Sequence, residues 1–133
     1  RDRKFVKRLK DVGASVSPKG DSLFNEDYQN WVVGDKSGRY FQQRSEAIKI
    51  LIEEGFNEPS IEGTTRIGFD MVVTKRNIDG VEKTLRYCRD RNLWVGFSWY
   101  LPSGRSGRDD FDRSLAVSED EKQKVRETIR TLF

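Results

Sequence analysis

The sequence contains no histidine and only one cysteine, Cys88. The absence of histidine removes the commonest general base and metal ligand of neutral-pH chemistry. A single thiol excludes an internal disulfide and any metal cluster held by several cysteines of this chain. Cys88 falls on the apolar side of a predicted helix with Val81 and Leu85, which favours a packed small hydrophobe over a nucleophile.

Long apolar runs are also missing. No run approaches the ~18 residues of a membrane span, and no secretory signal is visible. Together with the lone cysteine, these absences predict a cytoplasmic protein without a membrane partner. The chain begins RDRKFVKRL, without an initiator methionine and in the middle of a helical pattern. We therefore expect it to be a piece of a longer protein.

An excess of one charge is lacking as well. The net charge of +3, from 25 basic and 22 acidic residues, is too small to indicate a nucleic-acid partner without a localised patch. Aromatic residues are plentiful, with eight Phe, three Trp and four Tyr in 133 residues. Disordered chains are poor in aromatic residues, so we expect a folded protein. The length fits one domain, which spans roughly 100–200 residues.

The spacing of apolar residues predicts strands that alternate with helices. A capping box, Ser118 with Glu121 three residues later, opens the last helix. This alternation is typical of βα units with a parallel sheet, the α/β class. The expected helices span residues 2–12, 25–33, 41–54, 78–92 and the segment after 118, and the expected strands span 14–18, 66–74 and 93–101.

The strand predicted over 66–74 is apolar on more than one face. Every second residue from Ile67 to Val73 is apolar, and Val72 adds apolar character to the other side. We therefore expect this strand to be covered on both faces. The three predicted strands are too few to close an eight-stranded barrel, which takes about 250 residues. The chain is then either a fragment of a larger α/β barrel or a small three-layer domain.

In parallel α/β proteins, ligands bind at the loops that leave the C-terminal ends of the strands. The first such loop contains Ser17, Lys19, Asp21 and Ser22. An aspartate accepts hydrogen bonds from vicinal hydroxyl groups, and a lysine offsets a carboxylate. The alternative is that Asp21 or Ser22 caps the helix that follows.

The second loop runs from Thr74 to Asn77. Thr74 lies at the strand tip, where it can face a cavity, whereas Asn77 is more often a helix cap than a ligand, and Asp79 is a second candidate cap. Asp70 lies inside the strand between apolar residues. It either points into a barrel lumen, as a functional residue, or lies near the helical layer, where an unpaired carboxylate would be costly.

The third loop follows the most aromatic strand, in the stretch FSWYLPSGRSG over 97–107. A glycine-rich loop at the end of a strand lets a ligand approach the backbone closely. The alternative is a turn without any ligand, which the same glycine and serine composition supports.

Three stretches resemble, in order, the second half of the radical SAM enzyme core. They are GASVSPKGDSLFNEDYQNWVVG, AIKILIEEGF and GFDMVVTKRNIDGVEKTLRYCRDRNLWVGFSWYLPSGRSG. That core is a partial (β/α)6 barrel that holds S-adenosylmethionine and a [4Fe–4S] cluster. The resemblance covers residues 5–107. It implies that residues 1–107 form the C-terminal half of a partial TIM-like barrel, strands four to six, and that 108–133 form a linker and a C-terminal helix.

The resemblance also implies a function. The parent enzyme would cleave S-adenosylmethionine reductively to start radical chemistry on an unidentified small-molecule or peptide substrate, and this chain, inactive alone, would form one wall of the cofactor pocket. The implied cofactor contacts are Ser17, Lys19, Asp21, Thr74, Tyr100, Leu101 and Gly104, and the implied substrate contacts are Asp70 and Arg105.

Two parts of the family pattern are absent from this chain. The CxxxCxxC loop that binds the cluster is missing, and so is the Gly-Gly-Glu segment that binds the methionine amine. The cluster needs several thiolates, so the remainder of the parent chain must supply them. Many relatives also carry an arginine in the helix after the fourth strand, where Gln29 or no residue takes its place here.

Two other functions remain open. The aromatic residues Trp94, Trp99 and Tyr100 lie near Arg105, Arg108 and Arg113 in the sequence, a composition that fits an RNA or phosphate-binding module. Asp109, Asp110 and Asp112 almost neutralise that loop, so nucleic acid is the less favoured partner. A non-catalytic α/β interaction domain is the third alternative.

Overall fold

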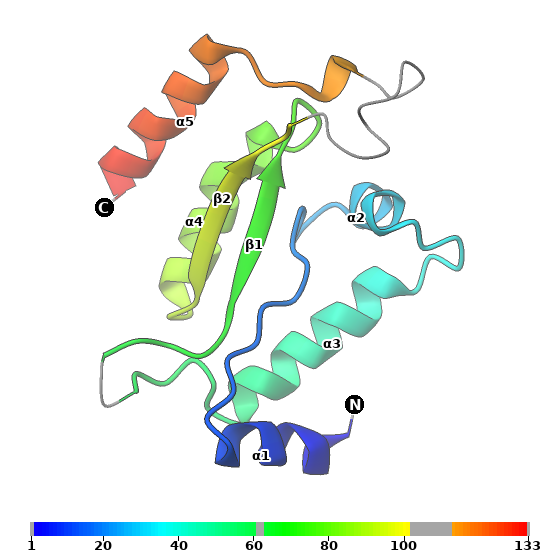
Figure 1. Cartoon of the computed structure of the whole chain (residues 1–133), viewed down its shortest axis with the longest axis vertical. Coiled ribbons are helices and arrows are strands. Elements are labelled where there is room, and N and C mark those ends of the chain that lie inside the picture. The colour runs from blue at the N-terminus through cyan, green and yellow to red at the C-terminus, as the bar shows by residue number, and fades with distance from the viewer. Residues whose placement is uncertain (1, 61–62, 102–112, 133) are drawn as a thin grey trace.

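The computed structural model describes residues 2–60, 63–101 and 113–132. In these residues the chain is a mixed α/β structure whose α-helices and two strands follow one another in the predicted order, except that the strand predicted over 14–18 does not form (Figure 1). The elements are α1 (Arg3–Asp11), α2 (Glu26–Val33), α3 (Tyr40–Glu53), β1 (Gly68–Val73), η1 (Ile78–Gly80), α4 (Val81–Asp90), β2 (Trp94–Trp99), η3 (Arg113–Leu115) and α5 (Glu119–Leu132).

The sheet is parallel, as predicted. Strands β1 and β2 pair in parallel from Gly68 opposite Trp94 to Val73 opposite Trp99. The third predicted strand, 14–18, is reduced to two isolated parallel bridges on the other edge of β1, Val16 with Ile67 and Lys19 with Asp70. Pro18 lies between the two bridges and has no backbone N–H, so it cannot donate to the ladder there.

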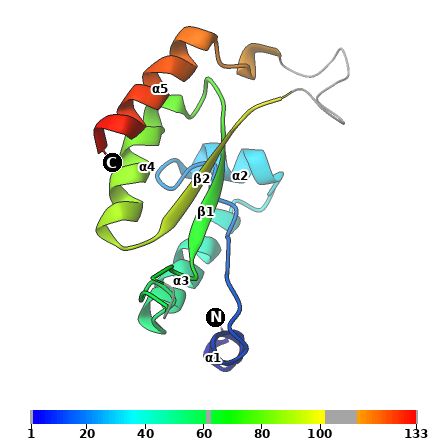
Figure 2. The same ribbon diagram turned by 60° about the vertical axis from the view of Figure 1, so that its left-hand side comes forward.

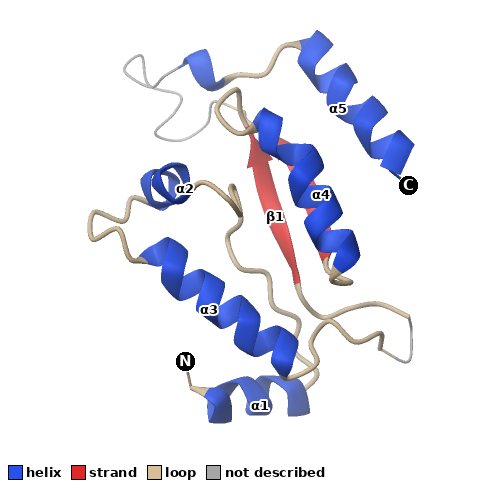
Figure 3. Cartoon of the chain, turned by 180° about the vertical axis from the view of Figure 1, so that it is seen from behind, coloured by secondary structure: helices blue, strands red, loops and turns tan. Residues whose placement is uncertain are grey.

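One face of the sheet carries the core. Ile67, Phe69, Met71 and Val73 are completely or almost completely buried on this face. The half of the core nearer the start of β1 is closed by α1, α3 and α4, and the half nearer its end by α4 and α5. Helix α4 lies behind the strands in Figure 1 and in front of them in Figure 3, which views the molecule from behind.

No described helix covers the opposite face of the sheet (Figures 1 and 2). On this open face Asp70 is exposed and Val72 is half-buried, although the sequence predicted cover on both sides. The described residues therefore form two layers, not three, because every described helix that contacts the core packs on the Phe69 side. Parallel sheets in complete proteins are covered on both faces.

Capping side chains fix several of the helix ends. The predicted capping box is confirmed, because the Glu121 carboxylate accepts from Ser118 N–H at 2.8 Å. Asn25 caps α2 through Tyr28 N–H at 2.9 Å, and Gly34 ends that helix in the left-handed conformation that glycine favours. Asn77 stands at the N-cap position of η1, which leads into α4, as predicted, but its side chain makes no capping hydrogen bond, and Asp79 lies inside η1.

The described helices are too short or too polar for a bilayer. None of those within 2–60, 63–101 and 113–132 combines the length and apolar character that crossing a membrane requires.

Candidate functional site

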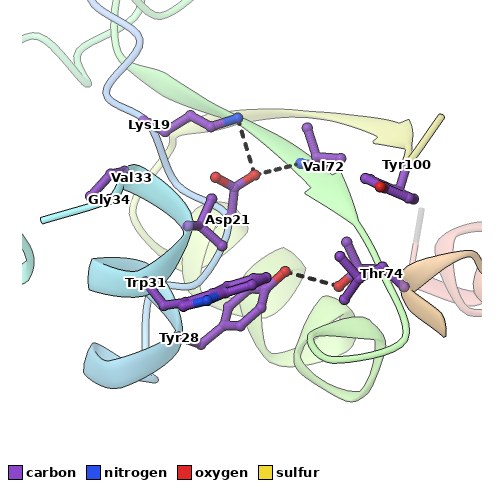
Figure 4. Close-up of a pocket in the computed structure, with 11 residues that line it drawn as sticks. Lys19, Asp21, Tyr28, Trp31, Val33, Gly34, Val72, Thr74 and Tyr100 are labelled. Carbon is purple, nitrogen blue, oxygen red and sulfur yellow. Dashed lines mark hydrogen bonds and ion pairs between the residues drawn. The ribbon is translucent and has the colours of Figure 1, made fainter. Parts of the chain in front are cut away.

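The C-terminal ends of the three parallel segments meet at one pocket of about 500 Å³, closed on one side by α2 (Figure 4). Its wall combines one cation, one carboxylate and hydroxyl groups with apolar and aromatic surface. The lining residues are Lys19, Asp21, Tyr28, Trp31, Val32, Val33, Gly34, Val72, Thr74, Tyr100 and Leu115. A pocket of this size and composition suits a small organic ligand.

The carboxylate of Asp21 is the most deeply buried charged group of the pocket, at 1% exposure. Its Oδ1 accepts from the backbone N–H of Val72 at 2.9 Å and pairs with Lys19 Nζ at 3.1 Å. Its Oδ2 has no hydrogen-bond partner among the described residues, and Figure 4 shows it pointing away from both Lys19 and Val72. A buried acceptor without a partner indicates a place for a donor from water or a ligand.

Hydroxyl groups line the floor beside Asp21. Tyr28 Oη and Thr74 Oγ1 are hydrogen-bonded at 2.9 Å (Figure 4). Burial raises the pKa of Tyr28, so its hydroxyl stays protonated as a donor at neutral pH. The Asn77 side chain then ties this floor to the first loop, because its Nδ2 donates to the carbonyls of Asp21 and Val72 and its Oδ1 accepts from Thr74 N–H.

Asp21 and Ser22 do not act as caps of α2, which is capped by Asn25. Asp21 binds the end of β1 instead, through Val72 N–H. Ser22 Oγ accepts from Asn25 N–H at 2.9 Å and so fixes the approach to the helix. The Asn77 side chain likewise binds the loops, although the residue stands at the N-cap position of η1.

Four of the predicted site residues line this pocket together: Lys19, Asp21, Thr74 and Tyr100. Leu101 is 73% exposed and does not line it. Gly104 and Arg105 lie outside the described residues, so the glycine-rich loop is not placed. The neighbouring ends of the three segments thus bring side chains from distant parts of the sequence together, as the parallel topology predicts.

The other two predicted site residues lie on the open face of the sheet. Ser17 Oγ donates to Asp70 Oδ2 at 3.0 Å, and neither residue lines the pocket. Asp70 thus points away from the helical layer. The carboxylate also lies over Gly96, because a Cβ built on that glycine would come 2.9 Å from Asp70 Oδ1. A glycine at this position therefore leaves room for the carboxylate.

The aromatic residues of the proposed RNA surface do not share a face. Trp94 pairs with Gly68 on the open face, whereas Trp99 packs against the core formed with α5. Lys122 and Arg126 of α5 lie near the Trp99 ring, 5.9 and 6.0 Å from its centroid. The loop with Arg105 and Arg108 lies outside the described residues.

Arg44 of α3 is a residue of this region that sequence reasoning missed. It is 5% exposed, and its guanidinium binds the loop that carries Lys19 and Asp21. The inward-facing position of Arg44 can be read from the sequence, because Arg44 is spaced with Phe41, Ile48 and Leu51 on the apolar side of the helix. A charged residue at an inward-facing position needs partners in the interior.

No metal site is formed by the described residues, among which no group of three or more Cys, Asp or Glu side chains could hold an ion. Cys88 is buried in the core between β1 and α4. Burial raises the pKa of its thiol to about 12, so the reactive thiolate is scarce at neutral pH.

We therefore expect Cys88 to resist alkylation. In native protein at pH 7.5, iodoacetamide should leave Cys88 unmodified over a time in which unfolded protein reacts fully, as intact-mass spectrometry measures. Equal rates in native and urea-unfolded protein would contradict the buried position of the thiol.

No family model, no curated protein and no solved structure matches this chain. Its function therefore has to be argued from its own residues and geometry.

Proposed function

We propose that this chain is the C-terminal half of a radical SAM enzyme core and forms one wall of its S-adenosylmethionine pocket. The observation that carries the proposal is the meeting of Lys19, Asp21, Thr74 and Tyr100 at the C-terminal ends of three parallel segments. The sequence motifs that resemble this family occupy the same segments. The parent enzyme would act on a small-molecule or peptide substrate.

The open face of the sheet supports a larger barrel. Parallel sheets bury both faces, and here the face with Asp70 and Ser17 has no cover within the described residues. The two outer segments of the sheet also have unpaired edges there. In the proposal, the remainder of the parent chain adds strands at an edge and closes a lumen over this face. Asp70, and Arg105 from the third loop, would then contact the substrate.

The pocket residues fit S-adenosylmethionine. The free Oδ2 of Asp21 is a buried acceptor that ribose hydroxyl groups could satisfy. Lys19 Nζ carries a positive charge suited to the methionine carboxylate, and Tyr28, Val72 and Leu115 offer apolar surface to the adenine.

The [4Fe–4S] cluster does not fit this chain. The single thiol of this chain, Cys88, lies in the core and outside the pocket. A four-iron cluster needs several thiolates. Its ligands must come from the remainder of the parent chain. In the assembled parent enzyme the cofactors would supply the radical chemistry. The residues of this chain bind and orient the cofactor and exclude water from it.

The test is reconstitution of the full-length parent protein with iron and sulfide without oxygen. We expect a brown protein that forms 5′-deoxyadenosine from S-adenosylmethionine and dithionite. Asp21→Asn should weaken S-adenosylmethionine binding by about 10- to 100-fold, since a hydrogen bond to a charged group contributes about 1.5–3 kcal/mol. Asp90→Asn, the same change at an exposed site on α4, is the matched control and should bind normally. A colourless protein that forms no 5′-deoxyadenosine would overturn the proposal.

A further inference from the structure

Arg44 is a buried cation at the back of the pocket loop. One nitrogen, Nη1, donates to three acceptors: the carbonyls of Lys19 (3.3 Å) and Ser22 (2.9 Å) and Oε1 of Gln29 (2.8 Å). Gln29 Oε1 also accepts from Ser22 N–H at 2.7 Å. Arg44 of α3 thus binds both ends of the segment that carries Asp21. Gln29 of α2 binds both Arg44 and the backbone of Ser22.

Among the residues that the structure describes, no carboxylate is hydrogen-bonded to this guanidinium. Burial lowers the pKa of Arg44, and the potentials of Tyr40 and Asp21 oppose that shift. Burying a cation without a paired anion is costly, and an apolar residue of similar volume often serves stability as well. The side chain also stacks on Phe41, 4.8 Å from the ring centroid. A buried cation with these contacts suits a residue whose role is to hold the loop of residues 19–22 in place.

We infer that Arg44 is a positioning residue that sets the Lys19–Ser22 loop, with Gln29 as its partner, so that Asp21 and Lys19 face the pocket. Arg44 does not line the pocket and has no direct contact with a ligand bound there. It acts through the loop carbonyls.

The first test is hydrogen exchange of two backbone amides in this chain. Ser22 N–H binds Gln29 Oε1, and Val72 N–H binds Asp21 Oδ1, so both report the position of the loop. In Arg44→Met we expect both amides to exchange at least tenfold faster relative to the core amide of Leu85. Arg44→Lys, which keeps the charge and three donors, should restore most of the protection.

Arg66→Met is the matched control. Arg66 also donates to a backbone carbonyl, that of Lys10 in the last turn of α1 at 2.9 Å, and lies over a phenylalanine ring, but outside the pocket. This variant should leave exchange at Ser22 and Val72 unchanged. If Arg44→Met also leaves them unchanged, the inference is overturned. If Arg44→Met does not fold, Gln29→Leu removes the acceptor that Arg44 shares with Ser22 N–H, and wild-type exchange at Val72, whose own acceptor is untouched, would then overturn the inference.

The second test rests on the proposed function. S-adenosylhomocysteine, titrated into the chain by calorimetry, should bind Arg44→Met at least tenfold more weakly than wild type, and Arg44→Lys should recover part of the affinity. Undiminished affinity of Arg44→Met would count against a positioning role. If the wild-type chain shows no binding, the proposed cofactor is in doubt, whereas the exchange experiment still decides the role of Arg44.

Discussion

Replacing Asp21 by alanine is expected to abolish ligand binding in the pocket and to lower the free energy of unfolding by about 1–3 kcal/mol. The loss of stability arises because Val72 N–H loses its acceptor at a position where water has little access. The ion pair with Lys19 adds little, since the Lys19 side chain is 44% exposed and solvent screens it. Urea denaturation followed by circular dichroism measures the first effect, and titration with S-adenosylhomocysteine measures the second.

The asparagine variant separates the two roles of this carboxylate. Asp21→Asn keeps an oxygen that can accept from Val72 N–H, so it should retain more stability than the alanine variant. The substitution puts an NH2 donor in place of one carboxylate oxygen and removes the negative charge opposite Lys19. The asparagine variant should therefore still bind ligand poorly. An Asn variant that binds normally would show that Asp21 is a structural residue only.

Alternating burial made β1 predictable from the sequence. The apolar residues at every second position, from Ile67 to Val73, are those that pack on the helices. The strand before α2 was harder, because Pro18 interrupts its hydrogen bonding and leaves two bridges. Cover on the second face was predicted from Val72, but a sequence pattern reports only that a residue suits burial. It does not say whether the covering segment belongs to the same chain.

The site was predicted in part for a physical reason. Parallel strands end at the same edge of a sheet, so the strand order alone predicts that the loops with Lys19, Asp21 and Thr74 lie together, whereas Tyr100 was a candidate through the family resemblance. Register decided the exceptions, since Ser17 pairs with Asp70 on the open face. The spacing of Arg44 marks it as inward-facing, but its partners are backbone carbonyls and a glutamine distant in the sequence, and backbone acceptors cannot be identified from a sequence.

The first loop and the core are in direct contact at Gly20. A Cβ built on Gly20 would lie 2.8 Å from Cδ1 of Phe69, a ring that is completely buried in the core. Removing the ring by Phe69→Ala should therefore cost about 3–5 kcal/mol of unfolding free energy. It should also loosen the Lys19–Asp21 segment, because that segment rests on the ring.

The same contact predicts that two substitutions interact. Gly20→Ala alone should cost about 1–3 kcal/mol, since the added methyl group forces the Phe69 ring out of place. In the Phe69→Ala background the methyl group meets space instead, so most of that cost should disappear, a coupling of about 1–2 kcal/mol. Phe56→Ala provides the control, because Phe56 is equally buried in the same cluster but is not among the nearest neighbours of Gly20. Urea denaturation of the single and double variants measures the coupling. If the losses of unfolding free energy caused by Gly20→Ala and Phe69→Ala simply add in the double variant, the pocket loop does not rest on this ring. The link between core and site would then be wrong.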